Sequence, residues 1–252
     1  MIQEADRRDM RTVLVTGAAG AIGSATVRAF LDEGFVVAGM DRDPAVLKPL
    51  HSRYLGSQVD LRDEGAVTTT IREMRSVGHL THVIGVAGGA LADETSADPL
   101  SLDLGTFMSS VEANLVTQFI VAQAALPLLR KGHGDRSIAL TSSFNALAGW
   151  GLPAYSAAKA GLIGLMNALT APLGAEGIRI NVVAPGTVRT PRTERIWQHD
   201  AAHFPRLTSQ SALGRLAAPE DVARAFLALA TLLTHVTGQV LVVDGGQMVK
   251  RG

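Results

Sequence analysis

The chain has 252 residues, no cysteine, and 23 basic and 23 acidic side chains, so its formal net charge is zero. Apolar residues make up 47% of the chain and charged residues 18%, which excludes the charge-rich composition of disordered proteins. The balanced charge disfavours nucleic-acid binding, and the lack of cysteine excludes a disulfide framework and a thiolate metal site.

The first ten residues are mostly polar and include two arginines and three acids. A secretory signal needs an apolar stretch with a small-residue cleavage site instead, and no apolar run reaches the ~18 residues that span a bilayer. We therefore expect residues 1–10 to be a flexible N-terminus of a soluble cytoplasmic protein. The length suits one α/β domain, which we expect over residues 1–252.

Short apolar runs alternate along the chain with longer stretches of helical pattern. They are rich in Val and Ile and are not polar at every second position, which is typical of strands buried on both faces of a parallel sheet. The runs cover residues 12–16, 35–40, 58–60, 82–87, 137–142, 178–184 and 239–243. Seven strands joined by crossover helices predict an α/β fold, a doubly wound seven-stranded parallel sheet that is Rossmann-like, with helices on both faces.

The first predicted strand runs into a glycine-rich turn, and a helix is predicted from about Ser24 to Glu33. Glycine permits a tight turn and a close approach of the backbone to a pyrophosphate, and the helix N-terminus offers free N–H groups. The context of strand, glycines and helix predicts a dinucleotide site. The turn reads Gly17-Ala18-Ala19-Gly20-Ala21-Ile22-Gly23.

An acid ends the second predicted strand. A carboxylate at Asp41 accepts hydrogen bonds from the ribose hydroxyls of adenosine and repels a 2′-phosphate, so it predicts NAD rather than NADP. Arg42 follows directly and is the contrary signal, because a basic residue can pair with that phosphate. We favour the ribose role for Asp41 and a surface position for Arg42.

Tyr155 and Lys159 lie four residues apart, after a proline at position 153 where a helix can start. On a helix this spacing puts both side chains on one face. A nearby ammonium lowers the pKa of a phenol, and a shift of about two to three units lets tyrosine exchange a proton with an alcohol or a ketone. Ser142 ends a predicted strand, where ligands of parallel sheets bind, and its hydroxyl is expected to hold the substrate oxygen.

Residues 189–215 are polar and arginine-rich, and we expect them to form a substrate lid. Its arginines would suit an anionic substrate, although solvated or subunit-bridging arginines are commoner. His199 and His203 have metal-ligand spacing, but without a glutamate beside them we expect lid residues and no metal. Either substrate contact or aromatic packing suits Phe144, Asn145, Leu147, Trp150 and Trp197.

These motifs resemble the short-chain dehydrogenase/reductase family, in its compact single-domain branch, from Thr12 to Gly246. The resemblance implies that Tyr155 is the acid/base, that Lys159 binds the nicotinamide ribose and lowers the tyrosine pKa, and that Asn114 supports a proton relay. It also implies that Ser142, rather than its neighbour Ser143, orients the substrate oxygen. The residues expected at the cofactor are Gly17, Gly20, Ala21, Ile22, Gly23, Asp41, Arg42, Asp60, Leu61, Ala87, Gly88, Tyr155, Lys159, Pro185, Gly186, Val188 and Thr190.

The sequence departs from the family pattern in three places. Ala21 stands where the compact branch has its second glycine, and we interpret it as a tolerated methyl. The family's Asn-Asn-Ala-Gly is Gly85-Val86-Ala87-Gly88 here, which removes hydrogen bonds expected to support the fourth strand. Pro172 should kink or end the catalytic helix, well past Lys159.

We therefore expect an NAD-dependent oxidoreductase that interconverts a secondary alcohol and a ketone, and that binds a small molecule rather than nucleic acid or a membrane. The resemblance implies a homodimer or homotetramer. Two alternatives remain: an NADP-dependent reductase of 3-oxoacyl thioesters or other ketones, and a non-enzymatic nucleotide-binding regulator or scaffold. Retention of Ser142, Tyr155 and Lys159 makes the second alternative the weakest.

Overall fold

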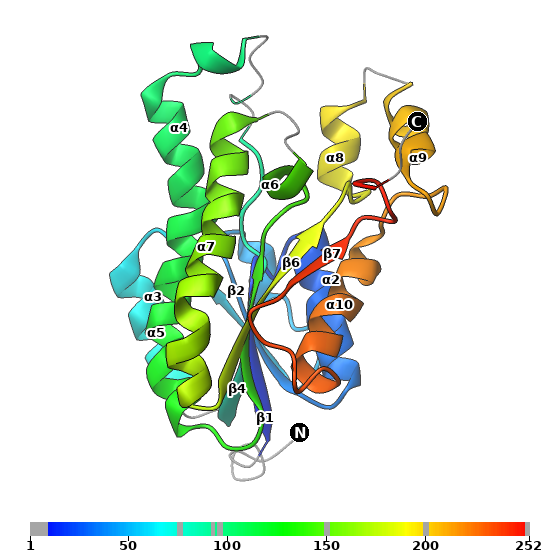
Figure 1. The fold of residues 1–252 in the computed structure, drawn as a ribbon. Helices are drawn as coiled ribbons and strands as arrows, with labels where there is room; N and C mark the ends of the chain where they lie inside the picture. Colours follow the sequence, from blue (N-terminus) through cyan, green and yellow to red (C-terminus); the bar gives the residue numbers. More distant parts are fainter. Residues whose placement is uncertain are drawn as a thin grey trace.

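A computed structural model of the chain describes residues 10–74, 78–91, 94, 98–148, 152–198 and 202–249. One parallel seven-stranded sheet runs through it, with the strand order β3-β2-β1-β4-β5-β6-β7 (Figure 1). The order reverses between β1 and β4, which confirms the predicted doubly wound α/β fold. The strands are β1 (Arg11–Thr16), β2 (Val36–Asp41), β3 (Tyr54–Gln58), β4 (His79–Gly85), β5 (Arg136–Thr141), β6 (Ile178–Pro185) and β7 (Val240–Val243).

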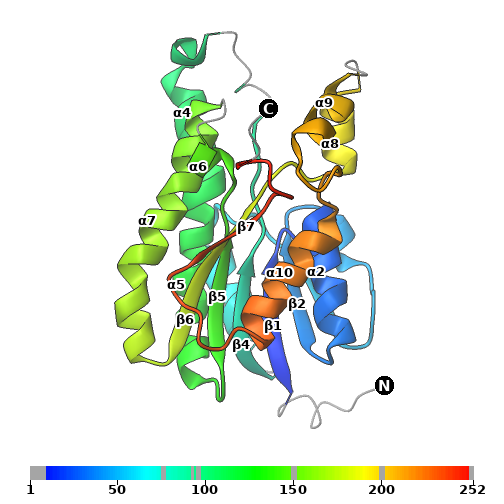
Figure 2. The same cartoon turned by 45° about the vertical axis from the view of Figure 1, so that its right-hand side comes forward.

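Helices cover both faces of the sheet, as Figures 1 and 2 show. One face carries α2 (Ala21–Asp32) and α10 (Pro219–Thr231), and the other carries α3 (Glu64–Glu73), α5 (Thr117–Lys131) and α7 (Pro153–Ala175). The remaining helices are α4 (Leu104–Val111), α6 (Asn145–Ala148), α8 (Pro191–Ile196) and α9 (His203–Gln210), with short turns η1 (Pro44–Leu47), η4 (Pro99–Ser101) and η5 (Glu112–Val116).

The sheet separates two apolar cores, because neighbouring residues of each strand point to opposite faces. In β1, Leu14 packs into the core under α3, α5 and α7. Val13 and Val15 pack into the core under α2 and α10, together with Phe30 and Phe226. This burial on both faces explains why the strands read as continuous apolar runs.

One expected strand was misplaced, and one of the two expected effects of Pro172 is not found. β3 covers Tyr54–Gln58 rather than residues 58–60, because this edge strand is only partly buried and so lacks the apolar signature of the central strands. Pro172 does not end the catalytic helix, since α7 continues to Ala175. Pro172 lies on the exposed side of the last turns, where water can reach the carbonyl that its missing N–H leaves unpaired.

The continuous helical segment Leu104–Lys131 is long and apolar enough to cross a membrane by length and composition, contrary to the count of apolar runs in the sequence. Ala125 and Leu129 on its inner face are fully buried in the core, and 33% of its most apolar window is buried. The cytoplasmic location stays a prediction. Of the N-terminal residues 1–10, only Met10 belongs to the described part of the chain.

Candidate active site

The glycine-rich turn lies between β1 and the start of α2. Gly17 has φ +66°, and a Cβ there would stand 2.9 Å from the backbone of Ala87. A Cβ at Gly23 would stand 1.9 Å from the carbonyl oxygen of Gly17, so both positions require glycine. The helix begins at Ala21 after a Gly20 cap without a capping side chain. Its first N–H groups are therefore free for an anion, and the methyl of Ala21 is accommodated in the helix.

Asp41 ends β2 beside this turn. Its Oδ2 accepts a hydrogen bond from the N–H of Ala19 at 3.0 Å, and its Oδ1 accepts one from the N–H of Asp43 at 3.0 Å. These bonds hold the carboxylate over the turn, as a ribose ligand requires. Arg42 is exposed, and its carbonyl accepts a hydrogen bond from the Gln58 side chain.

Asp60 and Leu61, which the family resemblance implies contact the adenine of the cofactor, follow β3. The Asp60 carboxylate accepts hydrogen bonds from the Arg62 guanidinium, with Nε to Oδ1 at 3.0 Å, and from the Arg62 N–H. Hydrogen bonds from Arg62 lower the pKa of Asp60 to about 2, so this carboxylate is ionised at neutral pH. Leu61 beside it is 7% exposed. The adenine contact itself stays a prediction.

The end of β4 has lost the asparagines of the family pattern, and other side chains provide the support. The Thr16 Oγ1 accepts hydrogen bonds from the N–H groups of Val86 and Ala87 at 3.1 and 3.3 Å. The buried Gln118 donates to the carbonyl of Ala87 at 3.3 Å, and its Oε1 accepts from the N–H of Thr141 at 3.1 Å. Sequence reasoning missed Gln118, because a glutamine inside a helix carries no local signal.

Asn114 lies in η5, a π-helical turn between α4 and α5. Such turns insert a residue into a helix and are frequent at functional sites. The Asn114 Oδ1 accepts a hydrogen bond from Gly89 N–H at 2.7 Å, and its Nδ2 donates to the Ser110 carbonyl at 3.0 Å. Asn114 is fully buried and so fixes the loop after β4. A Cβ on Gly88 would stand 2.6 Å from Asn114 Oδ1 and 3.2 Å from Lys159 Nζ, so these polar groups converge.

The structure brings Tyr155 and Lys159 onto one face of α7. Lys159 is 2% exposed, its Nζ lies 5.6 Å from the centre of the Tyr155 ring, and it donates to the Thr141 carbonyl at 2.8 Å. Burial lowers the pKa of Lys159 to about 7. Burial also raises the pKa of Tyr155. The depression of the tyrosine pKa by the lysine stays a prediction.

Ser142 and Ser143 differ in their hydrogen bonds. The Ser142 hydroxyl is 1% exposed and donates to the Lys159 carbonyl at 2.7 Å, so it ties β5 to α7. The Ser143 side chain is the one hydrogen bonded to Tyr155, and this bond lowers the tyrosine pKa. The structure therefore favours Ser143 over Ser142 as the group beside the substrate oxygen.

The end of β6 and the segment after it hold Pro185, Gly186, Val188 and Thr190, which the family resemblance implies lie at the nicotinamide. A Cβ on Gly186 would stand 2.8 Å from the Cα of Asp244, so the two strand ends approach closely there. Val188 forms a parallel bridge with Ala217. Thr190 caps α8, and its Oγ1 accepts from the N–H of Thr193 at 3.1 Å. The carbonyl of Pro185 accepts from the Phe144 N–H at 3.0 Å.

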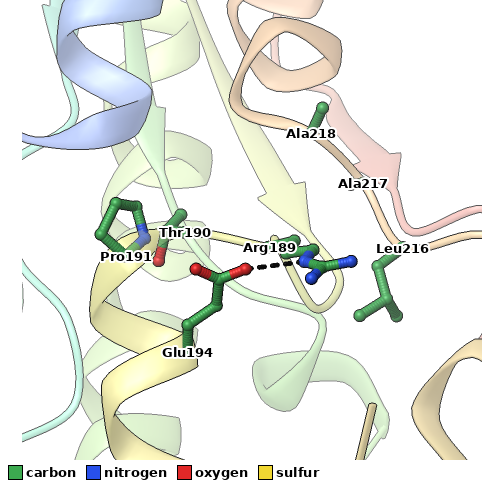
Figure 3. Close-up of a pocket in the computed structure, with 7 residues that line it drawn as sticks. All are labelled: Arg189, Thr190, Pro191, Glu194, Leu216, Ala217 and Ala218. Carbon is green, nitrogen blue, oxygen red and sulfur yellow. Dashed lines mark hydrogen bonds and ion pairs between the residues drawn. The ribbon is translucent and has the colours of Figure 1, made fainter. Parts of the chain in front are cut away.

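Beside this segment is an open cavity of about 310 Å³ (Figure 3). The Arg189 guanidinium pairs with the Glu194 carboxylate at 2.8 Å across it. Thr190 is the one lining residue that is also predicted to contact the cofactor. The lining residues are Arg189, Thr190, Pro191, Glu194, Leu216, Ala217 and Ala218.

The predicted lid carries α8 and α9, which stand above the carboxyl edge of the sheet in Figure 2. Trp197 stacks on His203 with 4.0 Å between ring centres, so both rings pack within the lid. Arg192 reaches from α8 to the loop after β4, where it donates to the carbonyl of Ala90. A Cβ on Gly89 would stand 2.4 Å from Arg192 Nη1, and the charge of Arg192 lowers the pKa of Tyr155. His199 lies outside the described residues.

The residues expected at the substrate are not all in one place. Phe144 is 5% exposed and packs under the segment after β6, which favours the packing alternative. Asn145 begins α6 and its N–H donates to Ser143 Oγ at 3.2 Å. Trp150 lies outside the described residues. Sequence reasoning also missed Glu94, a buried acid in an otherwise polar loop.

The chain is similar in sequence and in structure to known oxidoreductases. A family model described as enoyl-(acyl carrier protein) reductase matches residues 17–248. An uncharacterised oxidoreductase of Schizosaccharomyces pombe is 36% identical over 94% of this chain and 90% of its own. The L-fucose dehydrogenase of Rattus norvegicus is 34% identical over 94% of this chain and 88% of its own. A crystal structure of a short-chain dehydrogenase/reductase family oxidoreductase from Burkholderia thailandensis is 33% identical, with a TM-score of 0.86 over 96% of this chain and 94% of that chain.

Proposed function

The chain belongs to the short-chain dehydrogenase/reductase family and is an oxidoreductase of CH–OH groups, and on that premise we propose that it uses NAD to interconvert a secondary alcohol and its ketone. The observation that carries the proposal is the convergence of Tyr155, Lys159 and Ser143 at the carboxyl edge of the sheet. Ligands of doubly wound sheets bind at this edge, where the strand order reverses.

The residues present fit a dinucleotide. Gly17 and Gly23 leave no room for a Cβ, which is what a turn that approaches a pyrophosphate requires. The Asp41 carboxylate, held by Ala19 and Asp43, would bind the adenosine ribose, and its charge disfavours a 2′-phosphate. When bound, the nicotinamide supplies the hydride acceptor or donor.

The side chains divide the remaining chemistry among them. Tyr155 exchanges the proton of the substrate hydroxyl through its own Oη. Ser143 hydrogen bonds to Tyr155 and would hold the substrate oxygen. Lys159 would bind the nicotinamide ribose and, through its ammonium, stabilise the phenolate, while Asn114 fixes the loop at Gly89.

Polyhydroxylated alcohols are the first substrates to test, because a relative with 34% identity is named L-fucose dehydrogenase. The alternative, an NADP-dependent reductase, rests on Arg42, which is exposed next to Asp41. The charge of Arg42 also contributes to the lowered pKa of Asp60. Cofactor preference distinguishes the two.

The test is a fluorescence titration of the purified protein with NADH and, separately, NADPH, followed by a screen of sugars and simpler secondary alcohols with NAD. Preferential binding of NADH and reduction of NAD support the proposal. Preferential binding of NADPH overturns the role of Asp41 and supports the alternative, and binding of neither contradicts both.

We also propose that the chain forms a homodimer or homotetramer. Apolar side chains are exposed along α4 and α5, with Met108 54% and Phe119 41% exposed. They adjoin a shallow cavity of about 340 Å³ lined by Leu115, Val116, Phe119, Gly161 and Leu165. Exposed apolar patches of this kind mark interaction surfaces. A 26.4 kDa species on a sizing column would contradict this proposal.

A further inference from the structure

A buried carboxylate that the proposed mechanism does not use lies next to Tyr155. Glu94 is 3% exposed, in the loop between β4 and α4. Its Oε2 accepts a hydrogen bond from the backbone N–H of Tyr155 at 3.0 Å. Its Oε1 accepts from the N–H of Leu91 at 2.9 Å and from the Ser110 hydroxyl at 2.6 Å. One carboxylate therefore joins the loop, α4 and the first turn of α7.

These contacts suit a carboxylate better than other side chains. Two of the three donors are backbone N–H groups, which can only donate, so Glu94 must supply acceptors on both oxygens. The Tyr155 N–H belongs to the first turn of α7, where no carbonyl of the helix reaches it and where the helix dipole favours negative charge. A buried charge is retained when several hydrogen bonds compensate its lost hydration.

Few charged groups face Tyr155 in the described part of the chain. Glu94 approaches from the loop after β4, Lys159 lies one turn along α7, and Arg192 approaches from α8. Ser143, at the end of β5, is the polar neighbour. Glu94 is the acidic member of this set. The fields of Glu94 and Arg192 act on the tyrosine in opposite directions.

We propose that Glu94 is a positioning residue of the acid–base site, which fixes the first turn of α7 and holds a negative charge at the backbone N–H of Tyr155. The inference rests on the proposed function, because it concerns the same tyrosine. The charge favours the protonated phenol, the form that donates a proton to a ketone. Salt screens it weakly, because Glu94 is buried.

Ionisation of Tyr155 can be followed without any substrate. The chain has two tyrosines, and burial raises the pKa of the other, Tyr54, to about 12. In a Tyr54→Phe background, the phenolate absorbance reports on Tyr155 alone. We expect Glu94→Gln to move the titration midpoint to lower pH, since removal of a nearby negative charge favours the phenolate.

Matched variants separate charge from structure. Ser110→Ala removes a hydrogen bond to the same carboxylate but leaves the charge, so its midpoint should equal that of the background. Glu94→Asp withdraws the charge by one methylene and should give a smaller shift in the same direction, which keeps the test decisive if Glu94→Gln does not fold. An unchanged midpoint in folded Glu94→Gln, or an equal shift in Ser110→Ala, overturns the proposal.

The pH profile of turnover is the second measurement. With a substrate found in the alcohol screen, Glu94→Gln should shift the rise of kcat/KM for oxidation to lower pH by the same amount, and Ser110→Ala should not. The absorbance titration remains interpretable if no substrate turns over. Failure of the proposed function and failure of this inference are therefore distinguishable.

Discussion

The hydroxyl of Ser142 donates to the backbone carbonyl of Lys159 at 2.7 Å, which ties the end of β5 to the helix that carries Tyr155. The neighbouring hydroxyl, of Ser143, is left to hydrogen bond with the tyrosine. Two adjacent serines thus hold different positions: one inside the scaffold and one at the site.

This arrangement predicts different effects of two alanine variants. Ser143→Ala should lower kcat/KM about a hundredfold, because it removes the hydroxyl beside the acid/base. Ser142→Ala should lower the free energy of unfolding by about 1 kcal/mol with a much smaller effect on turnover. Steady-state kinetics and denaturant unfolding of both variants check this. The reverse pattern would restore Ser142 to the role expected from the sequence.

Asp41 is expected to set the cofactor preference. Asp41→Ala removes an acceptor for the ribose hydroxyls and the charge that repels a 2′-phosphate, so NADH should bind about ten- to a hundredfold more weakly and NADPH less weakly or better. Arg42→Ala is the matched control at the next position and should leave NADH affinity unchanged. If Asp41→Ala keeps the full preference for NADH, the Asp41 carboxylate does not set the cofactor preference through the ribose.

Lys159 is expected to lower the free energy of unfolding, although turnover depends on it. Burial lowers its pKa to about 7 from 10.5, so below pH about 7 the protein carries the full cost of the buried ammonium, and stability rises as pH increases toward 10.5. Lys159→Met should lose turnover yet gain on the order of 2 kcal/mol in unfolding free energy at neutral pH, since Gln118 still donates to the Thr141 carbonyl. Chemical denaturation measures this, with the exposed Lys131→Met as control. A Lys159→Met variant that is less stable than the wild type would show that the buried ammonium does not destabilise the fold.

His82 predicts acid sensitivity of the fold. It is buried in β4 with its Nδ1 2.9 Å from Ser137 Oγ, and burial lowers its pKa from 6.5 to about 4. The unfolded chain then binds a proton that the folded protein excludes, so stability is retained above pH 6.5 and falls by about 3 kcal/mol in all as the pH drops to 4. Unfolding curves of His82→Gln should be flatter over this range. The exposed His51→Gln should follow the wild type, and a His82→Gln curve that does so too would contradict the account.

Much of the fold could be predicted from the sequence, because strands that are buried on both faces consist mostly of apolar residues. The central strands are apolar on both faces, so β1, β2, β5 and β6 were found nearly to the residue. The edge strand β3 was displaced, because its half-exposed residues carry no such signature.

The site was predictable to the extent that local spacing encodes it. The helical period alone predicts that Tyr155 and Lys159 share a face, and the strand and helix around the glycines predict the turn. Which of Ser142 and Ser143 lies beside Tyr155 depends on the length of the loop before α7. The sequence gives that length but not which hydroxyl it brings to the tyrosine. Glu94 and Gln118 act through contacts with distant segments, so no local pattern announces them.

The most direct test of the account is the Tyr155→Phe variant, assayed for NADH binding and for turnover of the alcohol found in the screen. The change removes one oxygen and keeps the ring. We predict that NADH affinity stays within about twofold of the wild type while kcat falls at least a thousandfold, because the variant lacks the hydroxyl assigned to exchange the proton. A variant that retains full turnover would contradict the assignment of Tyr155 as the acid/base.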